Sequence, residues 1–435
     1  MKTTKLILNL LFLTGFANAQ TPMINPDLKT LINQSFNYFP KMKELQQQVS
    51  TSIYKADGTH SGNLPSVAAN VGYNYVAPIS QVLFPTGPNE FTTLYFQPHN
   101  NFNAALNVSQ TIYDFGKVKA TVEKAKDDIK ISKANLEANK ALLAAQVAGI
   151  YYSILYLKKA MRVQDSLLFT LNQSKKWIDS RLKNGDALEL DVLTVKNNID
   201  NANNRQADLQ NMLDKQMNLL YYTVGQTSIN ASPETNFDFD IISSLGDSAA
   251  AIALKSNPDV LLSQLRIDQA KHDLLLNKAA ALPSLNFTGS LGYRNGYQPD
   301  IYAVRFNYLL GVNLSVPLYQ GGRYLYQTKV AQSTLMQNQY SFENTNTTLR
   351  RDLAQATADI RLNEEKVKNT ASMVQQASLA LNMAQSRYKN GTIIYVELFT
   401  AQNNLQNAQL SKLQYEYQLC LAKIELTRLT GAVYW

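Results

Sequence analysis

Two long stretches of this chain carry apolar residues at helical spacing and almost no helix-breaking residues. Residues 117–184 contain no proline and a single glycine, Gly149, and residues 323–390 contain neither. In the first stretch apolar residues recur every seven positions, at Val122, Ile129, Leu136, Leu143, Ile150 and Leu157. A continuous helix over either stretch would be about 100 Å long, and the seven-residue spacing indicates coiled-coil packing.

Each long stretch is followed by an Asn-Gly pair and by a second, narrower apolar stripe. Asn184-Gly185 and Asn390-Gly391 tolerate the left-handed backbone that ends one helix and reverses the chain. Beyond Gly185 the stripe advances in steps of three and four, at Val192, Val195, Ile199, Ala202, Gln206, Leu209, Leu213, Gln216 and Leu220. The other faces are rich in Asn, Gln and Lys, so one side of these helices must meet water.

Four other segments alternate between apolar and polar residues, as strands do. In the first half of the chain the apolar positions are Val71, Tyr73, Tyr75, Leu106, Val108 and Ile112. In the second half, residues 285–293 and 308–317 follow the same pattern. Such strands, with tyrosines near their ends, are typical of membrane β-barrels, and a half-buried edge sheet in a soluble domain is the alternative.

The two halves of the chain repeat each other at a constant offset. Arg181-Leu-Lys-Asn-Gly185 recurs as Arg387-Tyr-Lys-Asn-Gly391, which is 206 residues later, and Gly116 recurs as Gly322. A match without insertions over such a length favours a rigid, duplicated helical architecture over an enzyme decorated with loops.

The first 19 residues have the features of an export signal. Lys2 and Lys5 precede an apolar run, and Ala17-Asn-Ala19 forms a small-x-small cleavage site. The run is too short to span a membrane as a helix, and no later stretch is expected to be apolar enough to do so. We therefore expect an exported mature chain.

Composition gives little support to catalysis or to nucleic-acid binding. Cys420 is the only cysteine and is expected to be buried, and His60, His99 and His272 are isolated along the chain. The formal net charge of +8 comes from basic residues scattered among acidic ones, so no nucleic acid is expected as a partner. No metal site, cofactor or catalytic constellation is predicted.

A sheet exposed to lipid must close on itself, because unpaired backbone groups are costly in hydrocarbon. Four strands are too few for a barrel, so the chain must share one with its own copies. Two copies would give eight strands and three would give twelve. We prefer three, because the duplicated chain then forms a pseudo-sixfold ring around a water-filled passage.

Several motifs occur twice and in the same order. They are Asn25-Pro-Asp27 with Asn257-Pro-Asp259, Leu64-Pro-Ser66 with Leu282-Pro-Ser284, Tyr113-Asp-Phe-Gly116 with Tyr319-Gln-Gly-Gly322, and the two Lys-Asn-Gly turns. In these features the chain resembles the TolC-type outer membrane efflux proteins. The resemblance implies a mainly α fold with membrane β: a trimeric, twelve-stranded outer-membrane barrel, four strands per chain, continuous with a periplasmic coiled-coil barrel.

The resemblance also implies a place and partners. The homotrimer would lie in the outer membrane of a Gram-negative bacterium, contact its lipid and extend into the periplasm. It would dock onto a periplasmic adaptor and an inner-membrane pump or ABC transporter, as the exit duct of a tripartite efflux or type I secretion system.

We expect the following division of the chain. It comprises a signal peptide (1–19), a first repeat (20–225) with a hairpin at about 66–114 and a helix pair at 116–225, a linker (226–256), a second repeat (257–431) with a hairpin at about 284–317 and a helix pair at 322–431, and a tail (432–435). The loops 77–101 and 294–303 would lie outside the cell. A lid, a phage receptor and an inert loop are equally open roles for the first of them.

The Asn-Gly turns lie farthest from the strands, so they would form the periplasmic mouth. Asp191 and Glu397 occupy equivalent positions just beyond the turns, and in a trimer they would provide six carboxylates that favour cations. Asp186 and Glu189 instead fit caps of the following helix. By resemblance, Glu397 matches a constriction acid, and Asp191 and Tyr388 match residues that tether the closed mouth.

The chain departs from the family pattern at two positions of this gate. Ile393 stands where the family has a basic tether residue, and Thr400 where it has a second constriction acid. Closure would then be weaker or rest on other contacts, such as those of Tyr388 and Arg387.

The exposed tips would also contact the adaptor, although a solvated helix end is an equal alternative. The residues concerned are Arg181, Lys183, Asn184, Gly185, Arg387, Lys389, Asn390 and Gly391. A second class of function, an exported coiled-coil scaffold or adhesin without a pore, leaves the four alternating segments unexplained.

Overall fold

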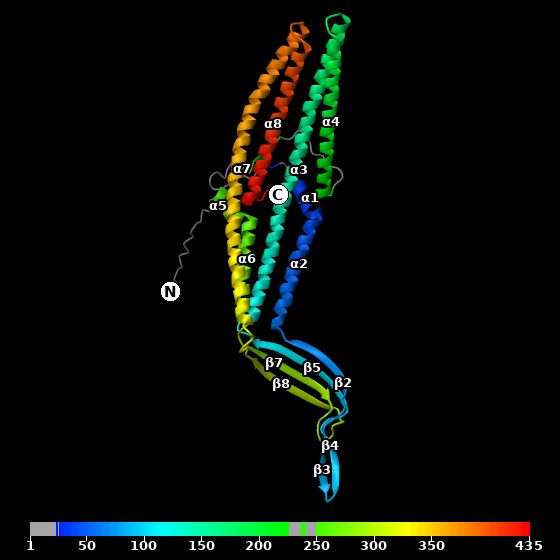
Figure 1. The fold of residues 1–435 in the computed structure, drawn as a ribbon, viewed down its shortest axis with the longest axis vertical. Coiled ribbons are helices and arrows are strands. Elements are labelled where there is room, and N and C mark those ends of the chain that lie inside the picture. Colours follow the sequence, from blue (N-terminus) through cyan, green and yellow to red (C-terminus); the bar gives the residue numbers. More distant parts are fainter. Residues whose placement is uncertain (1–22, 25, 226–235, 241–248) are drawn as a thin grey trace, which may run out of the picture.

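The computed structural model describes residues 23–24, 26–225, 236–240 and 249–435. The expected signal peptide and most of the expected linker lie outside the described residues. The described chain is elongated, with long helices at one end and a sheet at the other (Figure 1). This is the mainly helical fold with short antiparallel strands that the sequence predicts.

The four long helices obey the internal repeat. Helix α3 spans Lys117–Lys183 and α7 spans Arg323–Lys389, each with 67 residues. Helices α4 (Glu189–Val224) and α8 (Tyr395–Thr430) return from the tips, each with 36 residues. At 1.5 Å per residue α3 and α7 are each about 100 Å long. The predicted helix ends at Asn184 and Asn390 are confirmed.

Shorter helices extend each return helix toward the sheet. They are α1 (Pro26–Tyr38), α2 (Pro40–His60), the 3-10 turn η1 (Ser61–Asn63), α5 (Ala249–Ser256) and α6 (Pro258–Ala279). Helix α6 begins at the Asn-Pro-Asp motif, where the Asn257 side chain accepts hydrogen bonds from the backbone N–H groups of Asp259 and Val260. This arrangement caps the helix and places proline in its first turn.

The main core lies at mid-height, where α1, α2, α3, α4 and α8 meet. Tyr151 and Tyr152 of α3 are buried there, and the Tyr152 hydroxyl donates to the Asp238 carbonyl at 3.0 Å. Cys420 is also buried, as predicted, and burial raises the pKa of its thiol. Two short strands, β1 (Met23–Ile24) and β6 (Phe239–Asp240), pair beside this core.

One described helix includes a segment that is apolar enough to cross a membrane by length and composition alone. An 18-residue window of α3 has a mean hydropathy of 1.3, contrary to the expectation that no such stretch follows the signal. Since 61% of that window is buried inside the chain, its apolarity is explained by the mid-height core.

Four strands form one antiparallel sheet beyond the helices. They are β2 (Ser66–Tyr75), β5 (Asn100–Tyr113), β7 (Ser284–Arg294) and β8 (Arg305–Ser315), in the order β2-β5-β7-β8. The pairing of β5 with β7 joins the two repeats, and a register shift between Thr111 and Tyr113 interrupts it. Gly292 allows this pairing, because a Cβ there would lie 2.1 Å from the Ala104 carbonyl oxygen.

The register places most large apolar residues of the four strands on one face, while Leu309 lies on the other. Tyr73 lies opposite Phe102, Leu106 opposite Leu291, and Phe287 opposite Val312, in consecutive strand pairs. The opposite face carries Asn, Ser, Thr and Gly, and the Asn313 amide donates to the Thr288 hydroxyl at 3.1 Å. The apolar face is exposed in the single chain, with 85% of Val71 accessible.

The expected external loop 77–101 contains regular structure. Strands β3 (Gln81–Gly87) and β4 (Glu90–Tyr95) pair as a separate antiparallel hairpin. This hairpin forms the end of the molecule farthest from the helical tips (Figure 1). The two strands are joined by a two-residue turn at Pro88 and Asn89, and Asn89 adopts the left-handed region at a φ of 71°.

Candidate functional site at the helical tips

The two helix pairs end in turns of the same construction. Gly185 and Gly391 adopt φ angles of 81° and 74°, where a side chain would be strained. The Asp186 N–H donates to the Arg181 carbonyl at 2.8 Å, and the equivalent Thr392 N–H donates to the Arg387 carbonyl at 3.0 Å. These bonds fix the angle at which α4 and α8 leave the tips.

Below the turns, one apolar cluster joins the two helix pairs of the chain. Its buried residues are Ile178 of α3, Val192 and Val195 of α4, Leu381 and Tyr388 of α7, and Tyr395 and Leu398 of α8. Because all four helices contribute, the two pairs cannot separate here without exposing apolar surface to water.

Arg181 of α3 reaches across to the tip of α7. Its guanidinium lies 5.2 Å from the centroid of the Tyr388 ring, and its Nη1 donates to the Tyr388 carbonyl at 3.3 Å. Tyr388 itself is only 3% exposed. A cation stacked on an aromatic ring and bonded to the same residue holds the two tips together.

Two further contacts flank this pair. The Lys389 ammonium lies 4.9 Å from the Trp177 ring centroid, and the Asn198 amide donates to the Tyr395 hydroxyl at 3.4 Å. We call Trp177, Arg181, Tyr388, Lys389 and Tyr395 the tip cluster. Every one of these contacts runs between the first and the second repeat.

The tyrosines of the tip cluster remain neutral over the ordinary pH range. Burial raises the pKa of Tyr388, although Arg181 acts in the opposite direction. Burial likewise raises the pKa of Tyr395, to about 12. Both phenols therefore act as hydrogen-bonding aromatic groups and not as charges.

The acidic residues predicted for the mouth lie in different surroundings. Asp191 is half-buried, and its carboxylate accepts the Leu188 N–H at 3.3 Å, while Glu397 and Thr400 are exposed. The helix cap is thus made by Asp191 and not by the expected Asp186 and Glu189. The reason is that α4 begins at Glu189, which places Asp191 on its third residue, where a side chain reaches back to the preceding N–H.

Most of the predicted tip residues are exposed, as an adaptor contact would require. Lys183, Asn184, Gly185, Arg387, Lys389, Asn390 and Gly391 are exposed, whereas Arg181 is half-buried. The sequence predicts Arg387 as a partner in closure. The structure places the equivalent Arg181 against Tyr388, and Arg387 is exposed in the single chain.

Sequence reasoning missed Trp177, Tyr395 and Asn198. A signal for the first two was present, because they break the internal repeat: Trp177 corresponds to Met383, and Tyr395 to Glu189. Tyr388 is a third such position, since it corresponds to Leu182. Aromatic residues added to only one repeat indicate contacts that the repeat symmetry does not duplicate.

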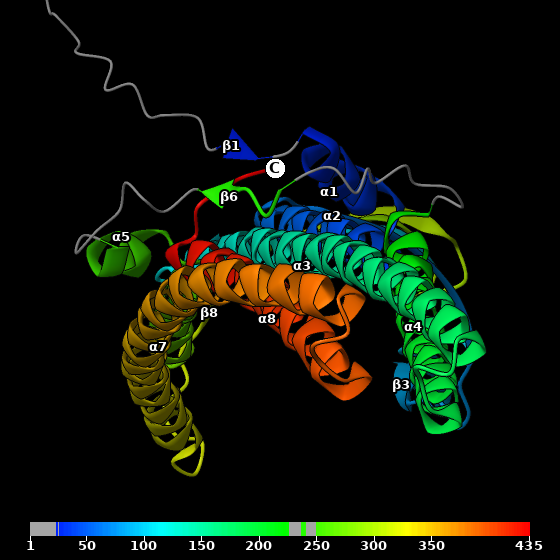
Figure 2. The same ribbon diagram turned by 90° about the horizontal axis from the view of Figure 1, so that it is seen from above.

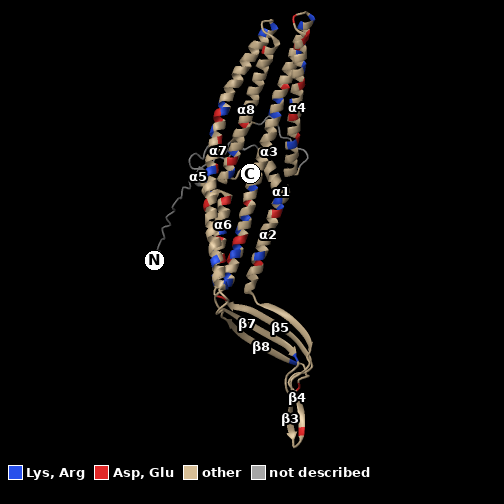
Figure 3. Cartoon of the chain, viewed as in Figure 1, with Lys and Arg blue, Asp and Glu red and all other residues tan. Residues whose placement is uncertain are grey.

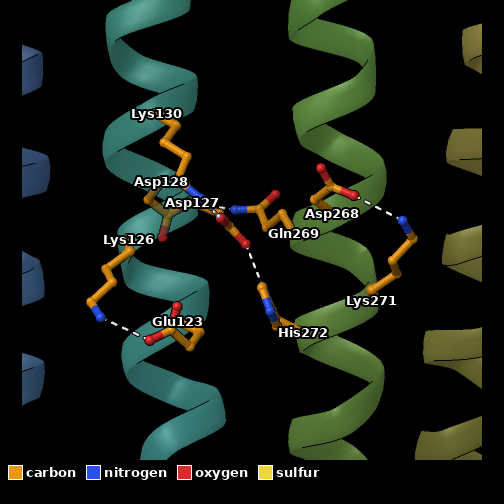
Figure 4. A network of polar contacts seen from close by, with 9 residues as sticks. All are labelled: Glu123, Lys126, Asp127, Asp128, Lys130, Asp268, Gln269, Lys271 and His272. Carbon is orange, nitrogen blue, oxygen red and sulfur yellow. Dashed lines mark hydrogen bonds and ion pairs between the residues drawn. The ribbon is translucent and has the colours of Figure 1, made fainter. Parts of the chain in front are cut away.

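A second polar group lies between α3 and α6, near the sheet. Asp127 is 1% exposed, and its carboxylate contacts His272 Nδ1 at 2.5 Å and the Lys130 ammonium at 2.9 Å (Figure 4). The adjacent Asp128 accepts from the Gln269 amide. The His272 and Gln269 contacts join α3 to α6, while the Lys130 contact lies within α3.

The charged residues are spread along the helices and gather again at the tips, while the sheet carries few (Figure 3). Within the described chain, no group of three or more His, Cys, Asp or Glu side chains is placed to hold a metal ion. The arrangement can therefore hold or release helix tips and influence ions near them.

Comparison with known proteins agrees with this arrangement. The family model described as outer membrane efflux protein matches residues 31–226 and 250–432, one match for each half. Outer membrane protein TolC of Vibrio cholerae serotype O1 is 23% identical over 416 residues, which cover 92% of this chain and 89% of that protein.

Solved structures share the fold at low sequence identity. A crystal structure of CusC superposes with a TM-score of 0.82 at 17% identity, covering 94% of this chain and 92% of that one. The CmeC outer membrane channel of Campylobacter jejuni superposes with a TM-score of 0.77 at 16% identity, covering 93% and 86%.

Proposed function

Because the chain belongs to the outer membrane efflux protein family, we propose that three copies of it form one export duct through the outer membrane and the periplasm. The chain is an outer-membrane efflux channel of a Gram-negative bacterium, and it conducts and does not catalyse. The trimeric assembly, the partner proteins and the gate are our proposals.

The observation that carries the proposal is the four-stranded sheet with a continuous apolar face and two free edges. In the described part of the chain, β2 and β8 each pair on one side only. In lipid such edges must find partners, and the edges of neighbouring copies can supply them. Three copies then give twelve strands, within the range of bacterial barrels.

The helices support the same assembly. Seen from the end, they follow one arc, with α7 at one side and α4 at the other (Figure 2). The part of α7 that lies next to the sheet exposes large apolar side chains, among them Leu325, Tyr326, Val330, Met336 and Tyr340. An arc with exposed apolar side chains at its end favours closure with further copies into a tube.

We propose that this tube takes its cargo from an inner-membrane pump or ABC transporter through a periplasmic adaptor. The adaptor would contact the exposed tips, and Lys183 and Arg387 are the residues best placed for it. Arg181 is less accessible, because it is held against Tyr388. We propose that the energy for export comes from the transporter.

At the mouth, we propose that the tip cluster keeps the helix pairs together and that Asp191 and Glu397 favour cations. In a trimer, two such acids per chain give six carboxylates near one level of the tube. The division of the chain into two repeats and an intervening linker is part of the same proposal.

Single-channel conductance in planar bilayers tests the duct and its acids together. We expect wild-type protein to give cation-selective steps, and Asp191→Asn/Glu397→Gln to lose most of that selectivity. Asparagine keeps the oxygen that caps α4, so the helix start should persist. The matched control is Asp186→Asn/Glu189→Gln, which also removes two charges, both beside the Asn184-Gly185 turn.

Unchanged selectivity in the first variant would contradict the role of the acids and leave the duct intact. Equal loss of selectivity in both double variants would show a general charge effect of the tip. If all of these proteins insert into lipid vesicles and none of them conducts ions, a scaffold without a pore would be favoured.

A further inference from the structure

The β3–β4 hairpin presents apolar side chains on both of its faces. Opposite residues in an antiparallel pair share a face, and successive residues alternate. One face therefore carries Leu83, Phe91 and Tyr95, and the other carries Val82, Phe84 and Leu94. All six are exposed in the single chain, Leu83 by 66% and Phe84 by 58%.

Among the described residues, hydrogen bonds at the base of the hairpin connect it to the rest of the chain. The Phe96 N–H donates to the Ser80 carbonyl at 3.1 Å, and the Gln298 amide from the β7–β8 connection donates to the Tyr95 carbonyl at 3.1 Å. Below it, the His99 ring stacks on Tyr75 with centroids 5.5 Å apart. Its direction relative to the sheet is thus set by bonds, while both faces stay uncovered.

An isolated two-stranded hairpin is only marginally stable in water, and exposed apolar patches of this kind mark contact surfaces. Between Gln81 and Tyr95 the only charged residue is Glu90, which lies beside the turn. A hairpin that lies on lipid or folds over its own barrel buries only one face, so it needs only one apolar face. The β3–β4 hairpin has two apolar faces, so a second contact surface is needed to cover the other.

We propose that the three β3–β4 hairpins of the trimer pack against one another and form an apolar collar at the external mouth. In a threefold ring each copy meets one neighbour with one surface and the other neighbour with a different surface. The Leu83 face of one hairpin would thus cover the Phe84 face of the next. The occupant is a second copy of this chain, and the inference rests on the proposed trimer.

Position in the fold supports this choice of occupant. The hairpin is an insertion between β2, a free edge of the sheet, and β5. A barrel closed through that edge would bring three such insertions to the same rim. The hairpin also lies at the end of the molecule opposite the helical tips (Figure 1), so the collar would be distinct from the periplasmic gate.

Cysteine cross-linking tests the contact between unlike faces. The double variant Leu83→Cys/Phe84→Cys places one thiol on each face, and the natural Cys420 is buried at 2% exposure and should not interfere. On oxidation, or with a short bis-maleimide, we expect a covalent trimer on a denaturing gel. Each single variant is the control and should stay monomeric, because like faces do not meet in the ring.

Native mass in detergent, measured on the same samples, separates the two levels of the proposal. A native trimer without covalent trimers in the double variant would overturn the collar and leave the duct standing. A chain that is not trimeric would overturn the proposed assembly itself. Covalent dimers from a single variant would show that like faces meet, which contradicts the ring.

Conductance gives a second, independent readout. Leu83→Asp adds a charge within the proposed contact, whereas Asn89→Asp adds the same charge at the turn, outside both faces. We expect the first variant to raise single-channel conductance, because the hairpins separate, and the second to match wild type. Equal conductance in all three proteins would contradict a collar that narrows the mouth.

Discussion

Arg181 and Arg387 occupy equivalent positions in the two repeats, yet their surroundings differ. Arg181 stacks on Tyr388 and bonds to its carbonyl, while Arg387 is exposed at the other tip. The difference arises from the ring that each arginine can reach. Tyr388 has Leu182 as its counterpart, so the first repeat offers Arg387 no equivalent aromatic partner.

This asymmetry gives a direct test of the tip cluster. Arg181→Ala removes a cation–π contact and a charged hydrogen bond, together worth about 1–2 kcal/mol, or roughly a five- to thirtyfold shift toward open tips. We expect higher single-channel conductance or a larger open fraction. Arg387→Ala is the matched control and should behave as wild type. The same increase in both variants would mean that tip charge, and not the Tyr388 contact, controls opening.

The buried carboxylate of Asp127 provides a second residue-level prediction. In His272→Ala, Asp127 would stay buried with one partner fewer, which should cost about 1–3 kcal/mol of unfolding free energy. Lys271→Ala is the control, because its pair with Asp268 is exposed and should contribute less than about 1 kcal/mol. Thermal unfolding in detergent measures both. Equal midpoints for the two variants would show that the His272 contact adds no stability.

At the scale of elements, buried polar side chains set the register of α3 against α8. Gln406 donates to the Gln164 Oε1 at 2.6 Å, and Gln164 donates to the Ala202 carbonyl at 2.8 Å. Gln402 donates to the Ser174 hydroxyl at 2.9 Å. All of these side chains except Ala202 are polar and nearly inaccessible. Polar groups within a coiled-coil core disfavour other registers, because a shift would leave them unpaired.

A double-mutant cycle tests this interpretation. Gln406→Leu alone leaves the Gln164 oxygen buried without its donor, and we expect a loss of about 1–3 kcal/mol. Gln164→Leu/Gln406→Leu removes both partners and should be closer to wild type than the single variant. Gln164→Leu completes the cycle, and thermal unfolding of wild type, the two single variants and the double variant gives the coupling. If the two substitutions destabilise additively, the glutamines do not act as a pair.

At the scale of the whole molecule, we expect the apolar face of the sheet to direct the chain into the outer membrane. Val71→Arg would place a charge near the middle of that face, at a cost of about 2–4 kcal/mol at the centre of a bilayer. We expect less protein in the outer-membrane fraction. Asn70→Arg carries the same charge on the opposite face and should insert as wild type does. Normal insertion of Val71→Arg would mean that this face does not contact lipid.

Sequence reasoning predicted the elements well, and local physical causes explain why. Helices α3 and α7 follow from long stretches without proline, and their ends follow from the glycines at 185 and 391. The alternation of β2, β5, β7 and β8 predicted one apolar face, which the observed register confirms. The loop 77–101 is the exception, because the sequence pattern predicts no strands there, whereas a turn at Pro88-Asn89 joins β3 and β4.

The candidate site was predicted less completely. The tips are exposed where the sequence predicts them, but Asp191 caps α4 in place of the predicted Asp186 and Glu189, because sequence patterns locate a helix start only to within a few residues. The sequence around Arg181 and Arg387 does not show which of the two arginines stacks on an aromatic ring. That contact depends on which ring of the other helix pair lies opposite each arginine, and Tyr388 lies opposite Arg181.

The sequence by itself therefore determined the periodic features: the long helices, the turns that end them, the strand faces and the duplication at 206 residues. These depend on neighbours that are close along the chain. Only the tertiary structure decided which repeat supplies the cation and which the aromatic rings at the tips, and that the external hairpin exposes two apolar faces. These features depend on contacts between distant segments, where two nearly identical repeats offer equivalent residues and only their packing distinguishes them.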